Sequence, residues 1–179
     1  MPKLIKKQTR RRMLQSLAFM VLLGAAALSG WPVDTLEIAD TREGAILHSS
    51  PVPLGCELET RIIHSVQLTP VVDFYRFQQG GLWGWREAIR SHNAGLPSQA
   101  PETGQFYQHG DWMILEGSAK PLPVIYYRVG TEKLGRNEIT LPQKPDLPVE
   151  LWRNHPGKRL SLKAVKKPLA SAIAEAQGF

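Results

Sequence analysis

The sequence predicts a mainly β protein: an antiparallel sandwich or partly open barrel of short strands, with an N-terminal transmembrane or signal helix and a short C-terminal helix. Short runs of β-branched and aromatic residues recur along the chain, and proline and glycine separate them at close intervals. With 179 residues, the chain suits one domain and a targeting segment. Cys56 is the one cysteine, so packing without internal disulfides must hold the fold.

Residues 1–31 have the order of a secretory signal: a basic stretch, an apolar core and then small residues. The core from Leu17 to Leu28 has the length of a signal peptide, and the wider stretch from Leu14 to Trp31 approaches that of a membrane-spanning helix. The segment therefore predicts a signal peptide or a signal anchor. In both cases the rest of the chain lies outside a bacterial inner membrane, facing the periplasm, or free in the periplasm after cleavage.

Three arginines just before the apolar core form the export signal. Arg10, Arg11 and Arg12 precede Met13 and Leu14, an order that resembles the twin-arginine signal. The alternative is that they supply the cytoplasmic-side charge that any signal segment carries. The sequence leaves both export routes open.

The positive charge of the chain is concentrated at its two ends. Lys and Arg within residues 3–12 account for the whole net charge of +6, so the rest is neutral and nucleic-acid binding is not expected. A second basic cluster lies at residues 158–167. We expect a solvated face there, with contact to anionic lipid or to a partner as the alternative.

The β domain is expected at residues 34–167 and a C-terminal helix or tail at residues 168–179. Alternation and turn signals predict strands at 35–39, 45–48, 57–66, 71–77, 82–92, 106–108, 112–115, 123–129, 134–141 and 160–165. Glycine and proline predict a loop over residues 94–104. Pro168 and the alanine-rich stretch after it predict the last helix.

The clearest element is a hairpin of strands 57–66 and 71–77, joined by a loop over residues 67–70. If Val66 pairs with Val71, the register places His64 opposite Asp73 on one face. That pair either orients the imidazole toward a ligand or is a satisfied core pair that stabilises the hairpin. Ser65 points to the other face, which argues against a serine-hydrolase triad.

Other chemical signatures are weak. The histidines are scattered without metal-ligand spacing, and we expect neither a metal nor a cofactor. Trp83, Trp85, Trp112 and Trp152 lie in strand-like segments and are expected in the core or at its rim, with Trp83, Trp85 and Ile89 on one strand face.

The run from Ile63 to Asp73, followed by Asn93-Ala94-Gly95-Leu96-Pro97, resembles an uncharacterised family of small exported bacterial proteins encoded beside TAXI-type TRAP transporters. The stretch from Tyr127 to Gly130 is similar as well, and the resemblance covers roughly residues 36–141. Asn93 replaces a glycine of the family loop, and Asp73 replaces the usual hairpin glutamate. The functional surface that the resemblance suggests consists of His64, Ser65, Thr69, Pro70, Asp73, Asn93, Gly95, Leu96 and Pro97.

Two hypotheses of function follow. The resemblance implies a non-enzymatic accessory protein at the inner membrane that assists a TRAP-type transporter in taking up an organic acid. The alternative is a periplasmic small-ligand binding or hydrolytic domain that uses His64 and Asp73 in a pocket walled by tryptophans.

Overall fold

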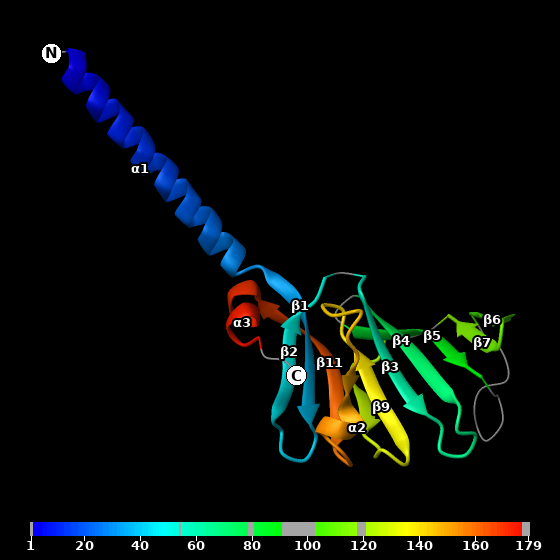
Figure 1. Cartoon of the computed structure of the whole chain (residues 1–179). Helices are drawn as coiled ribbons and strands as arrows, with labels where there is room; N and C mark the ends of the chain where they lie inside the picture. Colours follow the sequence, from blue (N-terminus) through cyan, green and yellow to red (C-terminus); the bar gives the residue numbers. More distant parts are fainter. Residues whose placement is uncertain (1, 54, 79–80, 91–102, 118–120, 177–179) are drawn as a thin grey trace.

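The computed structural model describes residues 2–53, 55–78, 81–90, 103–117 and 121–176, with side chains from Met13 onward (Figure 1). In chain order the elements are α1 (Pro2–Ser29), β1 (Pro32–Asp40), β2 (Ile46–Pro51), β3 (Glu57–Ile63), β4 (Pro70–Gln78), β5 (Gly81–Ile89), β6 (Gln105–His109), β7 (Trp112–Glu116), β8 (Ile125–Arg128), β9 (Gly135–Thr140), β10 (Val149–Glu150), α2 (Leu151–Asn154), β11 (Arg159–Pro168) and α3 (Leu169–Ala174).

The strands form two antiparallel sheets. The smaller has the order β2-β1-β11-β8, and the seven-stranded one has the order β10-β9-β3-β4-β5-β7-β6. The longest pairing joins β1 to β11, from Pro32 opposite Pro168 to Asp40 opposite Leu160, so the two ends of the β domain close one sheet. The mainly β prediction is confirmed, in the form of two separate sheets.

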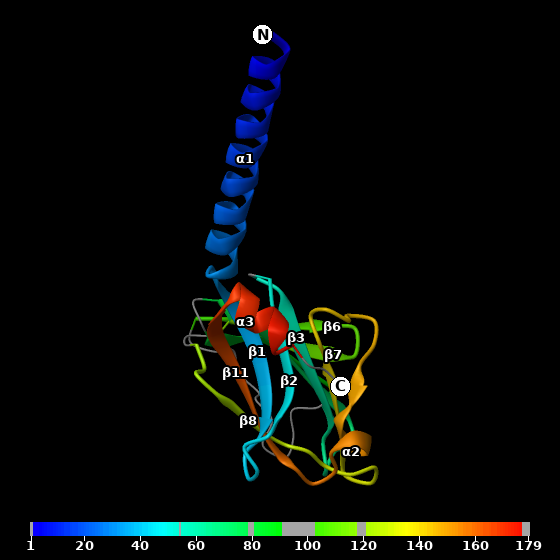
Figure 2. The same ribbon diagram turned by 90° about the vertical axis from the view of Figure 1, so that its left-hand side faces the viewer.

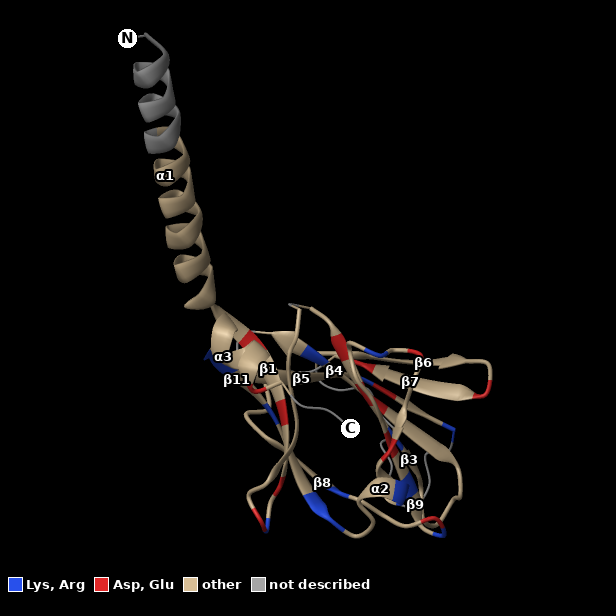
Figure 3. Cartoon of the chain, turned by 60° about the vertical axis from the view of Figure 1, so that its left-hand side comes forward, with Lys and Arg blue, Asp and Glu red and all other residues tan. Residues whose placement is uncertain are grey.

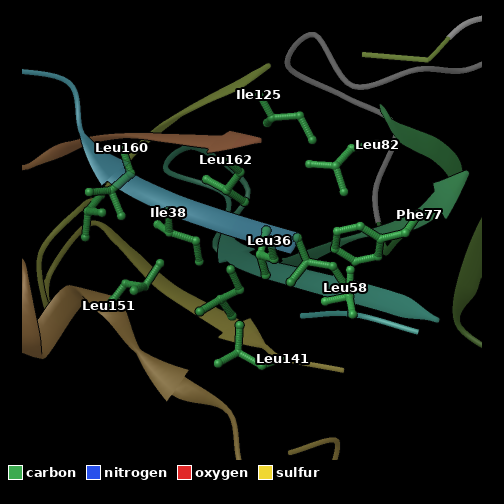
Figure 4. Close-up of a cluster of buried hydrophobic side chains, with 13 residues drawn as sticks. Leu36, Ile38, Leu58, Phe77, Leu82, Ile125, Leu141, Leu151, Leu160 and Leu162 are labelled. Carbon is green, nitrogen blue, oxygen red and sulfur yellow. The ribbon is translucent and has the colours of Figure 1, made fainter. Parts of the chain in front are cut away.

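The hydrophobic core lies between the sheets, and both contribute to it. Leu36 and Ile38 of β1 meet Leu58 of β3 and Phe77 of β4, and all four side chains are fully buried (Figure 4). Because side chains alternate across a strand, the spacing of two between Leu36 and Ile38 places both on the core face. We call the face of the seven-stranded sheet that carries Leu58 and Phe77 its inner face.

The helix α1 projects from the β domain (Figures 1 and 2). Its described side chains are largely exposed. Leu17 is 54% exposed, Phe19 63% and Leu22 67%, and no charged residue lies between Met13 and Ser29 (Figure 3). Among the residues that the structure describes, no helix is long and apolar enough to cross a membrane. The short helix α3 lies at the base of α1, where the amide of Leu169 donates to the carbonyl of Trp31.

The basic cluster near the C-terminus is largely paired with the acidic strand beside it. Lys167 Nζ lies 2.6 Å from carboxylate oxygens of both Glu37 and Glu175. Lys158 Nζ lies 2.9 Å from Asp40, and this hydrogen bond lowers the pKa of Asp40 to about 2. The expected solvated face is therefore part of an ion-pair network that joins β11 to β1, to the turn after β1 and to α3.

Most predicted strands are confirmed, and the differences arise from turns. The expected strand 57–66 ends at Ile63, and neither β10 nor α2 was predicted from the sequence. The register between β4 and β5 shifts after Phe74, so that Phe74 pairs with Arg86 while Tyr75 pairs with Gly84. This bulge reverses the side-chain alternation, and the prediction of Trp83 and Ile89 on one face was wrong.

Candidate functional site

The predicted hairpin exists with a different register and a longer connection. Ile63 pairs with Pro70, so the turn runs from His64 to Thr69 instead of over residues 67–70. Thr60, not His64, lies opposite Asp73, and the predicted His64–Asp73 pair was therefore wrong. The alternation of Ile62, His64 and Val66 suggested a strand, but Val66 is 68% exposed and belongs to the turn.

The imidazole of His64 organises this turn from within. Its Nδ1 accepts hydrogen bonds from the amides of Val66, at 3.3 Å, and Gln67, at 3.2 Å. The backbone of His64 also pairs with Leu68 and Thr69 across the turn. A neutral ring in this arrangement carries its proton on Nε2. His64 thus acts as a local cap, and its ring is positioned by backbone amides rather than by a carboxylate.

The turn contains the predicted site residues of the hairpin except Pro70 and Asp73. Ser65 is exposed within it, Thr69 precedes the strand, and Pro70 begins β4. Asn93, Gly95, Leu96 and Pro97 lie outside the described residues. Arg10, Arg11 and Arg12 belong to α1, in the part whose side chains are not described.

A second turn, between β8 and β9, lies beside the first. The amide of Gly130 donates to the side-chain oxygen of Asn137, which is 4% exposed. Thr131 and Leu134 close the turn with a short backbone hydrogen bond. A Cβ on Gly130 would overlap the carbonyl oxygen of Leu134, so only glycine fits this position.

The two turns line a pocket of about 680 Å³ that is open to solvent. Its lining residues are Ile63, Leu68, Glu132, Lys133, Gly135 and Arg136. Figures 1 and 2 place both turns at the end of the β domain away from α1. Val66, Leu68 and Leu134 on these turns are 57 to 69% exposed, and we call these three residues the distal surface.

Asp73 lies elsewhere, on the inner face of the large sheet, with Glu87 of β5 directly opposite. Burial raises the pKa of Asp73 to about 6, while the hydroxyls of Tyr75 and Thr60 act in the opposite direction. Burial and then the neighbouring Asp73 charge raise the pKa of Glu87 to about 7. The two carboxyl groups therefore hold a proton near neutral pH.

Sequence analysis missed Glu87, although a signal for it existed. Glu87 lies two residues before the buried Ile89 and so shares its strand face. The bulge between Gly84 and Arg86 breaks the alternation of side chains before Glu87. The pairing of Glu87 with Asp73 could therefore not be predicted from alternation along the strand. The acid pair adjoins Thr60 on one side and Leu115 on the other, and neither neighbour carries a charge.

The tryptophans pack in different surroundings. The guanidinium of Arg76 lies 3.5 Å from the centre of the Trp85 ring, and that of Arg86 lies 4.0 Å from it. Arg90 lies over Trp112 and Arg153 over Trp152. These contacts cover aromatic rings with cations that belong to the same chain.

Few groups in the described part of the chain suit covalent or metal chemistry. Within those residues, no three or more His, Cys, Asp or Glu side chains are placed to hold a metal ion. Burial raises the pKa of the Cys56 thiol to about 11, which disfavours the reactive thiolate. The arrangement suits binding: a pocket between two turns, an exposed distal surface and a proton-holding acid pair.

Comparison with known proteins gives a partial match. Residues 58–146 match a family described as "Domain of unknown function (DUF1850)". The matched segment contains the strands from β4 to β9 and nearly all of β3, so it includes both turns and the acid pair. No curated protein matches the chain. No solved structure matches it either.

Proposed function

We propose that the chain is an exported, non-enzymatic accessory protein, held at the bacterial inner membrane by α1, that assists a TAXI-type TRAP transporter in the uptake of an organic acid. The observation that carries this proposal is the position of α1, which projects away from the β domain (Figure 1). The apolar side chains of α1 are therefore exposed.

An apolar helix surface in water is costly, since each Å² removed from water is worth roughly 25 cal/mol. Phe19 and Leu22 are each more than 60% exposed. Basic residues precede this stretch and favour the cytoplasmic side of a membrane. Together these features support attachment of the chain to the inner membrane through α1, with the β domain on the periplasmic side.

The distal surface supports contact with a partner protein. Exposed apolar side chains that cluster on a soluble domain commonly mark an interaction site. Val66, Leu68 and Leu134 lie on turns fixed by hydrogen bonds, so their positions are defined before binding. Because they lie at the end away from α1, the proposed partner is a transporter subunit reached on the periplasmic side (Figure 2).

The non-enzymatic part of the proposal is supported by the state of His64. Its Nδ1 accepts from two backbone amides, and the register separates it from Asp73. The hydrolytic alternative needs an imidazole oriented by that carboxylate. The geometry of the described residues therefore favours binding over catalysis.

Uptake of organic acids by the proposed TRAP-type transporter tests the proposal in a strain that lacks this chain. We expect uptake to fall on deletion and to return with the full chain. Val66→Ser removes an exposed apolar side chain of the distal surface and should restore uptake poorly. The matched control is Leu147→Ser, because Leu147 is 66% exposed and lies outside both turns.

Equal expression and equal melting temperatures of the two variants establish that both fold. Normal uptake in the deletion strain contradicts the accessory role. Full rescue by Val66→Ser contradicts the distal surface as its contact site.

A further inference from the structure

Two strained residues on different turns meet at one pocket. Leu68 has φ 54° and Arg136 has φ 38°, and among the described residues these are the non-glycine residues with positive φ. Leu68 belongs to the turn between β3 and β4, and Arg136 lies at the start of β9. Both line the pocket of about 680 Å³ between the turns.

This conformation costs on the order of 1 to 2 kcal/mol for a residue with a Cβ, and glycine would remove the cost. The turn that contains Leu68 does not need a leucine side chain, because backbone groups and the His64 ring make its hydrogen bonds. The Arg136 side chain supports the turn before β9 through its Nε alone. Leu68 and Arg136 are thus strained residues whose side chains line the same pocket.

The walls of the pocket combine apolar and cationic groups. Ile63 and Leu68 supply apolar surface, while Lys133 and Arg136 supply two positive charges against the single carboxylate of Glu132. Within the described part of the chain, neither Lys133 nor Arg136 forms an ion pair. Arg136 Nε donates to the backbone carbonyl of Glu132 at 2.9 Å, which fixes the side chain and leaves the terminal nitrogens of the guanidinium for another acceptor.

We infer that this pocket binds a small organic anion, a carboxylate attached to an apolar body. The Arg136 guanidinium receives the carboxylate in the paired geometry that it favours, Lys133 adds charge, and Ile63 and Leu68 contact the apolar part. The volume lies within the usual range for small-molecule pockets. The site belongs to this chain alone, so it stands or fails independently of the proposed transporter.

Calorimetric titration of the full chain in detergent at pH 7.5 tests the inference with three probes. Benzoate carries both features, benzylammonium has the opposite charge, and acetate lacks the apolar body. We expect benzoate to bind at least about tenfold more tightly than either of the others. Arg136→Gln should weaken benzoate binding by about tenfold or more, whereas Arg42→Gln, at an exposed arginine of another turn, should not change it.

Leu68→Gly separates a binding role from a structural one. It relieves the strain, so the variant should melt at the same temperature as the parent chain or higher, and it should still bind benzoate more weakly because an apolar wall is lost. Lack of saturation by benzoate at about 10 mM overturns the inference. Equal affinity for benzoate and benzylammonium, or unchanged affinity in Arg136→Gln, overturns it as well.

Discussion

Asp73 of β4 and Glu87 of β5 lie directly opposite each other on the inner face of the seven-stranded sheet, and the structure gives neither a cationic partner among the described residues. Burial disfavours the ionised form of both carboxyl groups, and the charge of Asp73 adds to this effect at Glu87. The pKa of Asp73 rises from 3.8 to about 6, and that of Glu87 from 4.5 to about 7. In the unfolded chain both groups would lose their protons at lower pH.

This pair makes the folded state less stable as the pH rises. Between about pH 4 and pH 7 the folded state binds more protons than the unfolded state, so the free energy of unfolding falls across this window. Asp73→Asn or Glu87→Gln should raise the free energy of unfolding at pH 8 by about 1 to 2 kcal/mol and leave it nearly unchanged at pH 4. Urea titrations at both pH values measure the difference.

Asp146→Asn is the control, because Asp146 is exposed. The same gain at pH 4 and pH 8 in the two pair variants would show that ionisation of the buried carboxyl groups is not its source.

The centre of the core gives a second prediction. Leu36 is fully buried between the sheets, in contact with side chains of both (Figure 4). Leu36→Ala should lower the free energy of unfolding by about 2 to 5 kcal/mol, since it leaves a cavity in a packed interior. Leu147→Ala, at a leucine that is 66% exposed, should change it by less than about 0.5 kcal/mol. Similar losses for both variants in urea unfolding would contradict a core shared by the two sheets.

The turn between β8 and β9 gives a third prediction. Gly130→Ala places a methyl group on the carbonyl oxygen of Leu134 and within 2.9 Å of Asn137 Oδ1. The turn must open, and we expect the free energy of unfolding to fall by more than about 2 kcal/mol. Gly84→Ala is the control, because its methyl group meets the Tyr75 ring at an ordinary 3.5 Å. An unchanged melting temperature of the Gly130 variant would refute the close approach at this turn.

Local patterns in the sequence predicted elements well and their pairing less well. Alternation located β3 and β4 and correctly placed Asp73 on the same face as Leu58. The partner of Asp73 was wrong because register depends on where the turn begins. The turn begins at His64, so the strand ends at Ile63, three residues before its expected end.

Features that join distant segments could not be read locally. The alternation of β11 predicted a strand but gave no reason to pair it with β1, which lies more than a hundred residues earlier. The pocket requires that two turns meet, and Glu87 reaches Asp73 only through a bulged register. The strand pairing, the pocket and the acid pair each depend on how distant segments pack in the folded domain, and no single segment determines them.

The account depends most on where the β domain lies relative to the inner membrane. Protease digestion of spheroplasts that carry the full chain with a C-terminal epitope measures this directly. We predict that the epitope is digested in spheroplasts, is protected in intact cells, and that α1 keeps the undigested chain in the membrane pellet after a carbonate wash. An epitope that stays protected in spheroplasts, or a chain that the wash releases, would contradict the proposal.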